Sequence, residues 1–281
     1  MKIFLTGGTG FIGSYLLRDL INDEHEVVAL KRKGSSPHLK LSREPEWVEG
    51  SLDGDYIKYM ESVDVFIHLA SHTANHPYDS LENLLYWNVY ASIKLAKQAI
   101  EAGVKNFLVA GTCFEYGKAG EKKGIIDKNC SLEPTLSYPI SKAAASIAFE
   151  GLSREHNIKL KLLRIFQVFG EGESEKRLWP SLKKAAFEGK DFPMTKGEQL
   201  RDFVNVEDVS KTFMNSLNFN DVDELKPFVG HVATGKPQTL LEFSQHWWNL
   251  WEAKGSLLPG HVEYRKNESM KIISAPEDIV Y

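Results

Sequence analysis

A glycine-rich turn near the start of the chain restricts the possible folds more than any other feature. The sequence LTGGTGFIGSYLL places Gly7, Gly10 and Gly13 between a strand-like apolar run and an amphipathic helical pattern. Glycines at this spacing allow a tight turn, close helix–strand packing, and close approach of a diphosphate to the backbone. The helix that follows offers unpaired N–H groups and a partial positive charge to such a group. The pattern therefore predicts a dinucleotide-binding turn.

Short apolar runs alternate with longer helical patterns in the first 167 residues. We expect strands at residues 2–6, 26–30, 64–70, 106–111 and 159–166, and helices at 14–23, 81–103 and 139–156. Nearly continuous apolar strands between helices are typical of a parallel sheet that is covered on both faces. The predicted fold class is α/β, a Rossmann-type doubly wound parallel sheet with a smaller C-terminal substrate-binding lobe.

Composition excludes several other classes of protein. The hydrophobic fraction of 42% and the charged fraction of 26% are ordinary for a globular protein, and the net charge of −4 suggests neither nucleic acid nor an anionic membrane as a partner. The chain opens on MKIFLTGG and has no run of 18 apolar residues, so we expect neither secretion nor a membrane span. Its two cysteines, Cys113 and Cys130, fit a reducing compartment, and we expect a cytoplasmic protein.

The second predicted strand ends in basic residues. In dinucleotide-binding folds, an acidic residue about 20 positions after the glycines holds the adenosine ribose of NAD. Here Lys31 lies 18 residues after Gly13, Arg32 follows it, and neither position carries a carboxylate. A cationic pair fits a 2′-phosphate, which arginine binds in a bidentate manner and lysine as a point charge. The sequence thus favours NADP(H) over NAD(H), and the alternative is a solvated basic loop.

Beyond residue 167, turn-rich segments such as GEGESEK separate shorter helical stretches. We therefore predict an NADP-binding Rossmann domain at residues 1–167, to which the chain returns near 202–215 and 229–235. Residues 168–281 would mainly form the substrate-binding lobe.

Tyr138 and Lys142 in SYPISK are one helical turn apart, which places both side chains on one face. This spacing alone is weak evidence, because ten tyrosines give about one such match by chance. Thr112, however, lies at the C-terminal end of the preceding strand, where open α/β sheets bind ligands. A tyrosine needs a nearby ammonium group to exchange protons near neutral pH, and Lys142 can supply it. These three residues are therefore candidates for one site at this edge of the sheet.

Motifs along nearly the whole chain resemble the extended short-chain dehydrogenase/reductase family, in its sugar-nucleotide epimerase, dehydratase and ketoreductase branch. They are TGGTGFIG, VFIHLAS, YWNV, GTCFEYG, YPISK, LLRIFQVFGEGE and RDFVNVEDV. The resemblance implies that Thr112, Tyr138 and Lys142 form the catalytic triad. It also implies hydride transfer between a nicotinamide and a sugar carbon, with Lys142 bound to the nicotinamide ribose.

The resemblance assigns further contacts by position. Cofactor contacts would be Thr9, Phe11 and Ile12 in the turn, Ser51, Leu52, Leu69, Ala70, Ser71 and Asn88. Ser51 stands where the family usually has aspartate. Substrate contacts would be His72, Thr112, Gln167, Arg201 and Arg265, of which the two arginines resemble those that bind the substrate pyrophosphate. For either arginine a surface salt bridge is the alternative, and Gln167 replaces a common asparagine, which leaves its role open.

Several reactions are compatible with this family. Its dehydratases carry Thr-Asp-Glu where this chain has Thr112, Cys113 and Phe114, so dehydration is disfavoured. The short chain, GTCFEYG and EYRKNE are similar to the CDP-abequose synthase type of ketoreductase. We therefore predict NADPH-dependent reduction of the C4 keto group of a dTDP-, CDP- or GDP-linked 4-keto-6-deoxyhexose, for a surface polysaccharide such as O-antigen. The alternatives are an NAD-dependent nucleotide-sugar 4-epimerase and a non-catalytic NADP-sensing protein, which has no need of the triad.

Other features predict less. The resemblance implies a homodimer through a four-helix bundle, built from the helices around 81–102 and 139–156. His68, His72 and His76 recur every four residues, but a strand pattern contains His68 and Pro77 breaks any helix, so we expect no metal site. Trp247 and Trp251 are expected in the core of the lobe rather than under a sugar, and Cys113 as a buried residue rather than a nucleophile.

Overall fold

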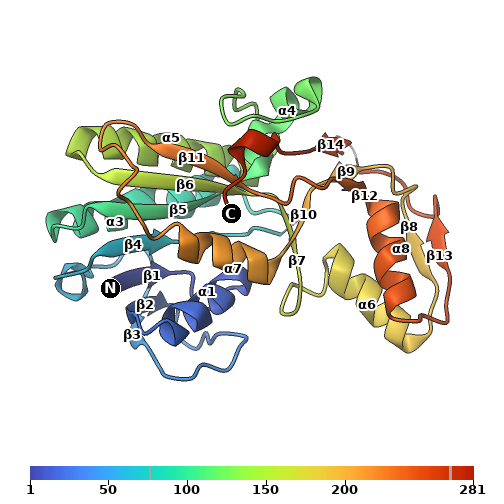
Figure 1. The fold of residues 1–281 in the computed structure, drawn as a ribbon, viewed down its shortest axis with the longest axis horizontal. Helices are drawn as coiled ribbons and strands as arrows, with labels where there is room; N and C mark the ends of the chain where they lie inside the picture. Colours follow the sequence, from blue (N-terminus) through green and yellow to red (C-terminus); the bar gives the residue numbers. More distant parts are fainter. Residues whose placement is uncertain (76, 266–267) are drawn as a thin grey trace.

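The computed structural model describes residues 1–75, 77–265 and 268–281 of the chain (Figure 1). Its centre is a seven-stranded sheet in the order β11-β6-β5-β4-β1-β2-β3, in which every neighbouring pair is parallel. The strands are β1 (Lys2–Thr6), β2 (Glu26–Lys31), β3 (Glu46–Glu49), β4 (Val65–His68), β5 (Asn106–Thr112), β6 (Lys159–Ile165) and β11 (Phe228–Val232). The predicted α/β fold with a Rossmann-type parallel sheet is confirmed.

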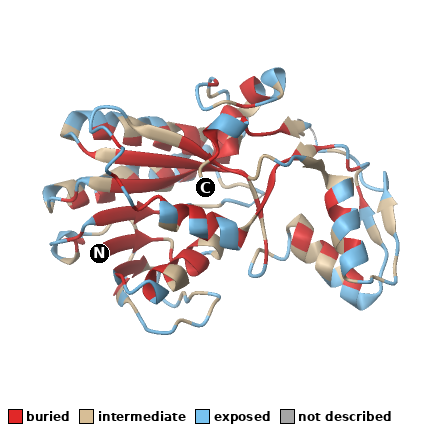
Figure 2. Ribbon diagram, viewed as in Figure 1, coloured by how far each residue is buried: buried red, intermediate tan, exposed pale blue. Residues whose placement is uncertain are grey.

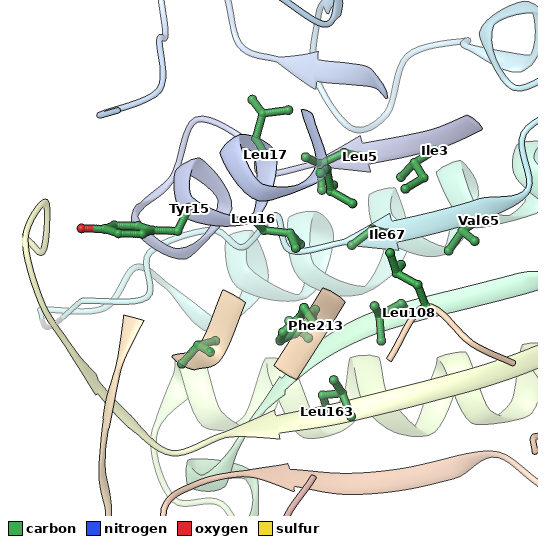
Figure 3. Packing of buried hydrophobic residues seen from close by; sticks show 14 of the residues in the cluster. Ile3, Leu5, Tyr15, Leu16, Leu17, Val65, Ile67, Leu108, Leu163 and Phe213 are labelled. Carbon is green, nitrogen blue, oxygen red and sulfur yellow. The ribbon is translucent and has the colours of Figure 1, made fainter. Parts of the chain in front are cut away.

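Helices cover both faces of this sheet, because successive residues of each strand point to opposite sides. Ile3 and Leu5 of β1 join one apolar cluster with α1 (Phe11–Asn22) and α7 (Val206–Asn215), which Figure 3 shows from close by. Phe4, between them, joins a second cluster with α3 (Ser92–Glu101) and α5 (Ser137–His156). Figure 2 shows the resulting buried strands between partly exposed helices.

The predicted helix over residues 81–103 forms as three consecutive pieces. These are α2 (Leu81–Leu85), the π-helical turn η2 (Tyr86–Ala91) and α3. Single π turns inside helices occur often at functional sites, and this one buries Asn88. Helix α1 begins at Phe11, three residues earlier than predicted, and β3 was not predicted. Only one of the four residues in β3 is buried, so its sequence has no clear apolar pattern.

The C-terminal part of the chain forms small sheets and two helices beside the main sheet (Figure 1). The sheets pair β7 (Gln167–Phe169) with β10 (Phe203–Asn205), β8 (Phe192–Met194) with β13 (Leu257–Pro259), and β9 (Leu200–Arg201) with β12 (Gln238–Thr239) and β14 (Lys271–Ile272). The helices are α6 (Leu178–Glu188) and α8 (Leu240–Leu250), and they enclose aromatic clusters. Trp247 and Trp251 pack against these clusters, as expected of core residues. The predicted boundary at residue 167 stays a prediction.

The remaining short elements are η1 (Ile57–Tyr59), η3 (Cys113–Tyr116), α4 (Gly117–Lys123) and η4 (Pro276–Asp278). In the described part of the chain, no helix combines the length and apolar character that a membrane crossing requires.

Candidate active site

The glycine turn between β1 and α1 leaves no room for larger side chains. Gly7 has φ +79°, and a Cβ atom there would lie 2.6 Å from the backbone nitrogen of Ala70. A Cβ atom at Gly13 would lie 1.9 Å from the Gly7 carbonyl oxygen, which also accepts a hydrogen bond from Gly10 N at 2.9 Å. The glycine turn therefore lies so close to its own backbone and to the segment after β4 that only glycine fits at positions 7 and 13. The predicted role of these glycines thus has a steric basis.

The N-terminus of α1 has the properties of a diphosphate site. Gly10 precedes the helix in extended conformation, and among the described residues no side chain caps it and no acidic residue lies in the first turn. Phe11 and Ile12 in that turn are half-buried. Their backbone N–H groups can therefore point at a bound anion. The glycine turn, which has no side chains to block the backbone, and the uncapped helix together fit the diphosphate of a dinucleotide.

The end of β2 is more neutral than its sequence suggests. Lys31 Nζ lies 3.5 Å from the Glu49 carboxylate, its neighbour on β3, and 4.9 Å from the centre of the Trp47 ring. Arg32 is exposed, and none of the hydrogen bonds or ion pairs found among the described residues uses its guanidinium. The Arg32 carbonyl accepts from Ser35 Oγ at 2.8 Å, and Thr9 Oγ1 donates to that same Oγ at 3.4 Å. Of the pair that the sequence predicts to bind the 2′-phosphate, Arg32 is thus more available than Lys31.

Ser51 and Leu52 follow β3. The Ser51 hydroxyl donates to the Asp53 carboxylate, and Leu52 packs on the cluster beneath the sheet. Asp53 also accepts from Tyr86 OH at 2.8 Å. A carboxylate therefore lies two residues after the position where the family usually has one, next to Ser51.

The segment that follows β4 contains several predicted contact residues. Leu69 N and Ala70 N donate to the carbonyl and the hydroxyl of Thr6, which anchors the strand end beside the glycine turn. Asn88 of η2 accepts from His72 N at 2.7 Å and donates to Ser141 Oγ at 3.0 Å. Asn88 thereby ties this segment to α5.

His72 is already engaged by a carboxylate. His72 Nε2 lies 2.8 Å from Asp79 Oδ2, and its ring lies 6.4 Å from that of Trp87. The hydrogen bond from His72 holds the pKa of Asp79 below its ordinary value. The His72 ring faces Asp79, so a contact with substrate stays a prediction.

Tyr138 and Lys142 lie in the first two turns of α5, and Pro139 fits there because first-turn N–H groups need no helical partner. The exposed fractions of the two residues are only 9% and 6%. Burial raises the pKa of Tyr138, and a hydrogen bond with Ser71 partly offsets this. Burial lowers the pKa of Lys142, whose Nζ donates to the Ala110 carbonyl at 2.8 Å. Among the described residues, no hydrogen bond joins Lys142 directly to Tyr138.

Thr112 ends β5 and precedes η3. Its hydroxyl accepts from Phe114 N at 3.4 Å, while its own N–H donates to Glu115 Oε1 at 2.8 Å. Thr112 is 7% exposed. The strand end and α5 thus hold all three predicted catalytic residues in one buried region, at the carboxyl edge of the sheet.

The basic residues predicted to hold the substrate lie in different surroundings. Arg201 is buried, donates to Ser269 O and pairs with Glu268 at 3.2 Å, and burial lowers its pKa. Arg265 is exposed. Gln167 is half-buried in β7, and its backbone N–H donates to Asp202 O at 3.1 Å. Arg201 is therefore occupied within the chain, whereas Arg265 is open to solvent.

Tyr78 and Arg177 are candidate site residues that the sequence did not reveal. The Tyr78 ring lies 5.3 Å from that of Tyr138. Burial raises the pKa of Tyr78, and the charges of Arg177 and Arg265 lower it, so both cations lie within electrostatic range. Tyr78 and Arg177 stand in segments without regular periodicity, and only tertiary folding brings them to Tyr138.

Residues predicted to have no catalytic part are buried. Burial raises the pKa of the Cys113 thiol to about 12, so it carries no thiolate near neutral pH. His68 bonds to Thr6 and Ser92 inside the sheet–helix layer, and burial lowers its pKa to about 3. His76 lies outside the described residues, among which no group of metal-ligating side chains occurs.

Two surface hollows, of about 500 and 440 Å³, are lined by other residues than those of the candidate site.

Known proteins of one family resemble this chain. The model of the NAD-dependent epimerase/dehydratase family matches residues 3–226. The dTDP-6-deoxy-L-talose 4-dehydrogenase (NAD(+)) of Aggregatibacter actinomycetemcomitans is 31% identical over 247 residues, covering 85% of this chain and 87% of that protein. An uncharacterized UDP-glucose epimerase of Bacillus subtilis is 30% identical over 234 residues, covering 75% and 71%. The structure of a UDP-glucose 4-epimerase from Thermotoga maritima shares the fold with a TM-score of 0.85, at 22% identity and coverage of 99% and 91%.

Proposed function

Because the chain belongs to the NAD-dependent epimerase/dehydratase family, whose members here are enzymes acting on nucleotide sugars, we propose a specific reaction for it. The protein reduces the C4 keto group of a nucleotide-linked 4-keto-6-deoxyhexose with a nicotinamide cofactor. The product is an activated deoxysugar for a surface polysaccharide.

The proposal is carried by the buried region that holds Thr112, Tyr138 and Lys142, and by the residues that follow Thr112 there. Cys113 and Phe114 occupy the positions after Thr112, and the next residue, Glu115, is fully buried with both oxygens hydrogen-bonded. Elimination of water needs an acid and a base at the sugar, whereas carbonyl reduction needs one proton donor. The similarity to a 4-dehydrogenase supports the same conclusion, since oxidation at C4 is the reverse of this reduction.

The residues of the chain would divide the chemistry as follows. Bound cofactor supplies the hydride. Tyr138 donates its proton to O4, and its raised pKa keeps the phenol protonated until that step. Lys142, one turn along the same helix, provides a positive charge for the phenolate that remains. Thr112, whose hydroxyl is oriented by Phe114 N, holds the keto oxygen.

For the cofactor we propose NADP(H) over NAD(H), with Arg32 as the residue that contacts the 2′-phosphate. The support is that Arg32 is exposed and that its backbone carbonyl accepts from Ser35 Oγ, which is hydrogen-bonded to Thr9 of the glycine turn, whereas Lys31 is shared with Glu49. The related 4-dehydrogenase is named as an NAD(+) enzyme, so the choice needs a direct test. Replacing Arg32 with alanine should raise the KM for NADPH by about 10-fold or more, the worth of a charge-assisted contact, and leave the KM for NADH unchanged. Lys33→Ala, an exposed neighbour, is the matched control, and equal changes for both cofactors would refute the assignment.

We further propose a cytoplasmic homodimer formed through α2, η2 and α5, with a nucleotide sugar as its small-molecule partner. The support is a set of exposed apolar side chains on these adjacent helices: Leu81, Leu85, Tyr86, Tyr90 and Ile147. Such a patch is typical of an interface.

The first experiment is cofactor oxidation followed at 340 nm. The protein is mixed with NADPH or NADH and a freshly prepared dTDP-, CDP- or GDP-4-keto-6-deoxyhexose. Loss of absorbance with one of these sugars, reduced on the order of 10²–10⁴-fold by Tyr138→Phe, supports the ketoreductase. Lack of oxidation with every keto sugar, together with NAD bound to the purified protein, would instead support the 4-epimerase.

A further inference from the structure

We propose that Glu115 is a positioning residue, which holds Thr112 against helix α5 and places a negative charge beside the helix turn that carries Lys142. The inference rests on the proposed function, because it gives Glu115 a role toward the proposed catalytic residues. Glu115 lies in η3 with an exposed fraction of 0%. It cannot reach substrate from there, so its effect must pass through its neighbours.

One carboxylate group joins three elements of the site. Glu115 Oε1 accepts from Thr112 N at 2.8 Å, at the end of β5. Glu115 Oε2 accepts from Ser146 Oγ and from Arg164 Nε, each at 2.8 Å. Ser146 lies on α5, one turn after Lys142, and Arg164 lies on β6. The carboxylate therefore fixes Thr112 relative to the helix that carries Tyr138 and Lys142.

The same group governs the charge of Lys142. Burial lowers the pKa of Lys142, and the negative charge of Glu115 opposes that change. The other titratable groups around Lys142 do not replace it. His68 on β4 is neutral, with a pKa of about 3, Tyr138 on α5 has a raised pKa, and Arg164 on β6 is paired with Glu115. Of these groups, Glu115 is thus the one whose charge favours the protonated form of Lys142.

The charge is tested by measuring NADPH affinity against pH, from tryptophan fluorescence, without turnover. Wild-type protein should lose affinity as Lys142 deprotonates, and in Glu115→Gln the midpoint should move to lower pH. Lys142→Met should lack this transition. Ser146→Ala keeps the charge and should leave the midpoint unchanged while kcat falls several-fold at constant KM.

Equal midpoints in wild type and Glu115→Gln would overturn the proposal. Should the single variant fail to fold with Arg164 left unpaired, Glu115→Gln/Arg164→Met replaces the whole buried pair, which proteins often tolerate. This double variant must then show the lowered midpoint. Wild-type protein that binds NADPH but reduces none of the keto sugars would refute the proposed function, whereas the pH titration still decides the role of Glu115.

Discussion

Glu173, in the segment between β7 and α6, provides a quantitative test of the structure. Its side chain is only 5% exposed, Oε1 lies 3.0 Å from Arg177 Nε, and Oε2 has no hydrogen-bond partner among the described residues. Burial raises the pKa of Glu173 from 4.5 to about 7, although the charge of Arg177 partly opposes this. The folded protein therefore binds a proton that the unfolded chain releases.

A raised carboxyl pKa makes stability depend on pH in a defined direction. The favourable contribution of the protonated group is complete below the unfolded pKa of 4.5 and is lost as the pH rises through 7. With about 1.36 kcal/mol per pKa unit, Glu173 alone should lower the free energy of unfolding by about 2.5 kcal/mol between pH 5 and pH 8.

Urea unfolding at pH 5 and pH 8, followed by tryptophan fluorescence, measures this difference. Glu173→Gln cannot ionise, so its stability should fall by about 2.5 kcal/mol less than that of the wild type between the two pH values. Any cost of burying the amide is present at both pH values and cancels. Glu175→Gln, an exposed neighbour, should behave as wild type. Equal pH dependence in wild type and Glu173→Gln would refute the reasoning.

Two further predictions concern the glycine turn and the proposed dimer. Gly13→Ala should lower stability by roughly 2 kcal/mol or more and weaken NADPH binding at least tenfold, because its Cβ atom meets Gly7 O at 1.9 Å. Gly151→Ala, in a helix with open space around it, should instead stabilise by roughly 0.5–1 kcal/mol, and equal effects in urea unfolding would contradict the steric account. Ile147→Asp should convert a dimer to a monomer in light scattering after gel filtration, whereas Phe187→Asp, at an exposed position of α6, should not. A dimer that survives Ile147→Asp would exclude this face as the interface.

Local patterns account for most of the main sheet. Phe4 and its neighbours Ile3 and Leu5 are apolar, and a run of this kind is stable only when helices bury both faces of the strand. The sequence does not predict β3, because Val48 is its only buried residue and the strand therefore has no apolar pattern. The π turn that contains Asn88 likewise has no local signal, and Asn88 bonds there to His72 and Ser141, which are distant in sequence.

The sequence by itself determined the parallel sheet and the glycine turn. Both depend on residue type at short spacing, which strand and helix geometry convert directly into position. The catalytic set of Thr112, Tyr138 and Lys142 stays a prediction from the resemblance to the family. Only the tertiary structure decided how charges far apart in sequence combine. It brought Glu49 to Lys31 across two strands, Glu115 to Arg164, and Arg177 into the range of Tyr78. Electrostatic interaction depends on distance and burial, and neither can be read from the order of residues along the chain.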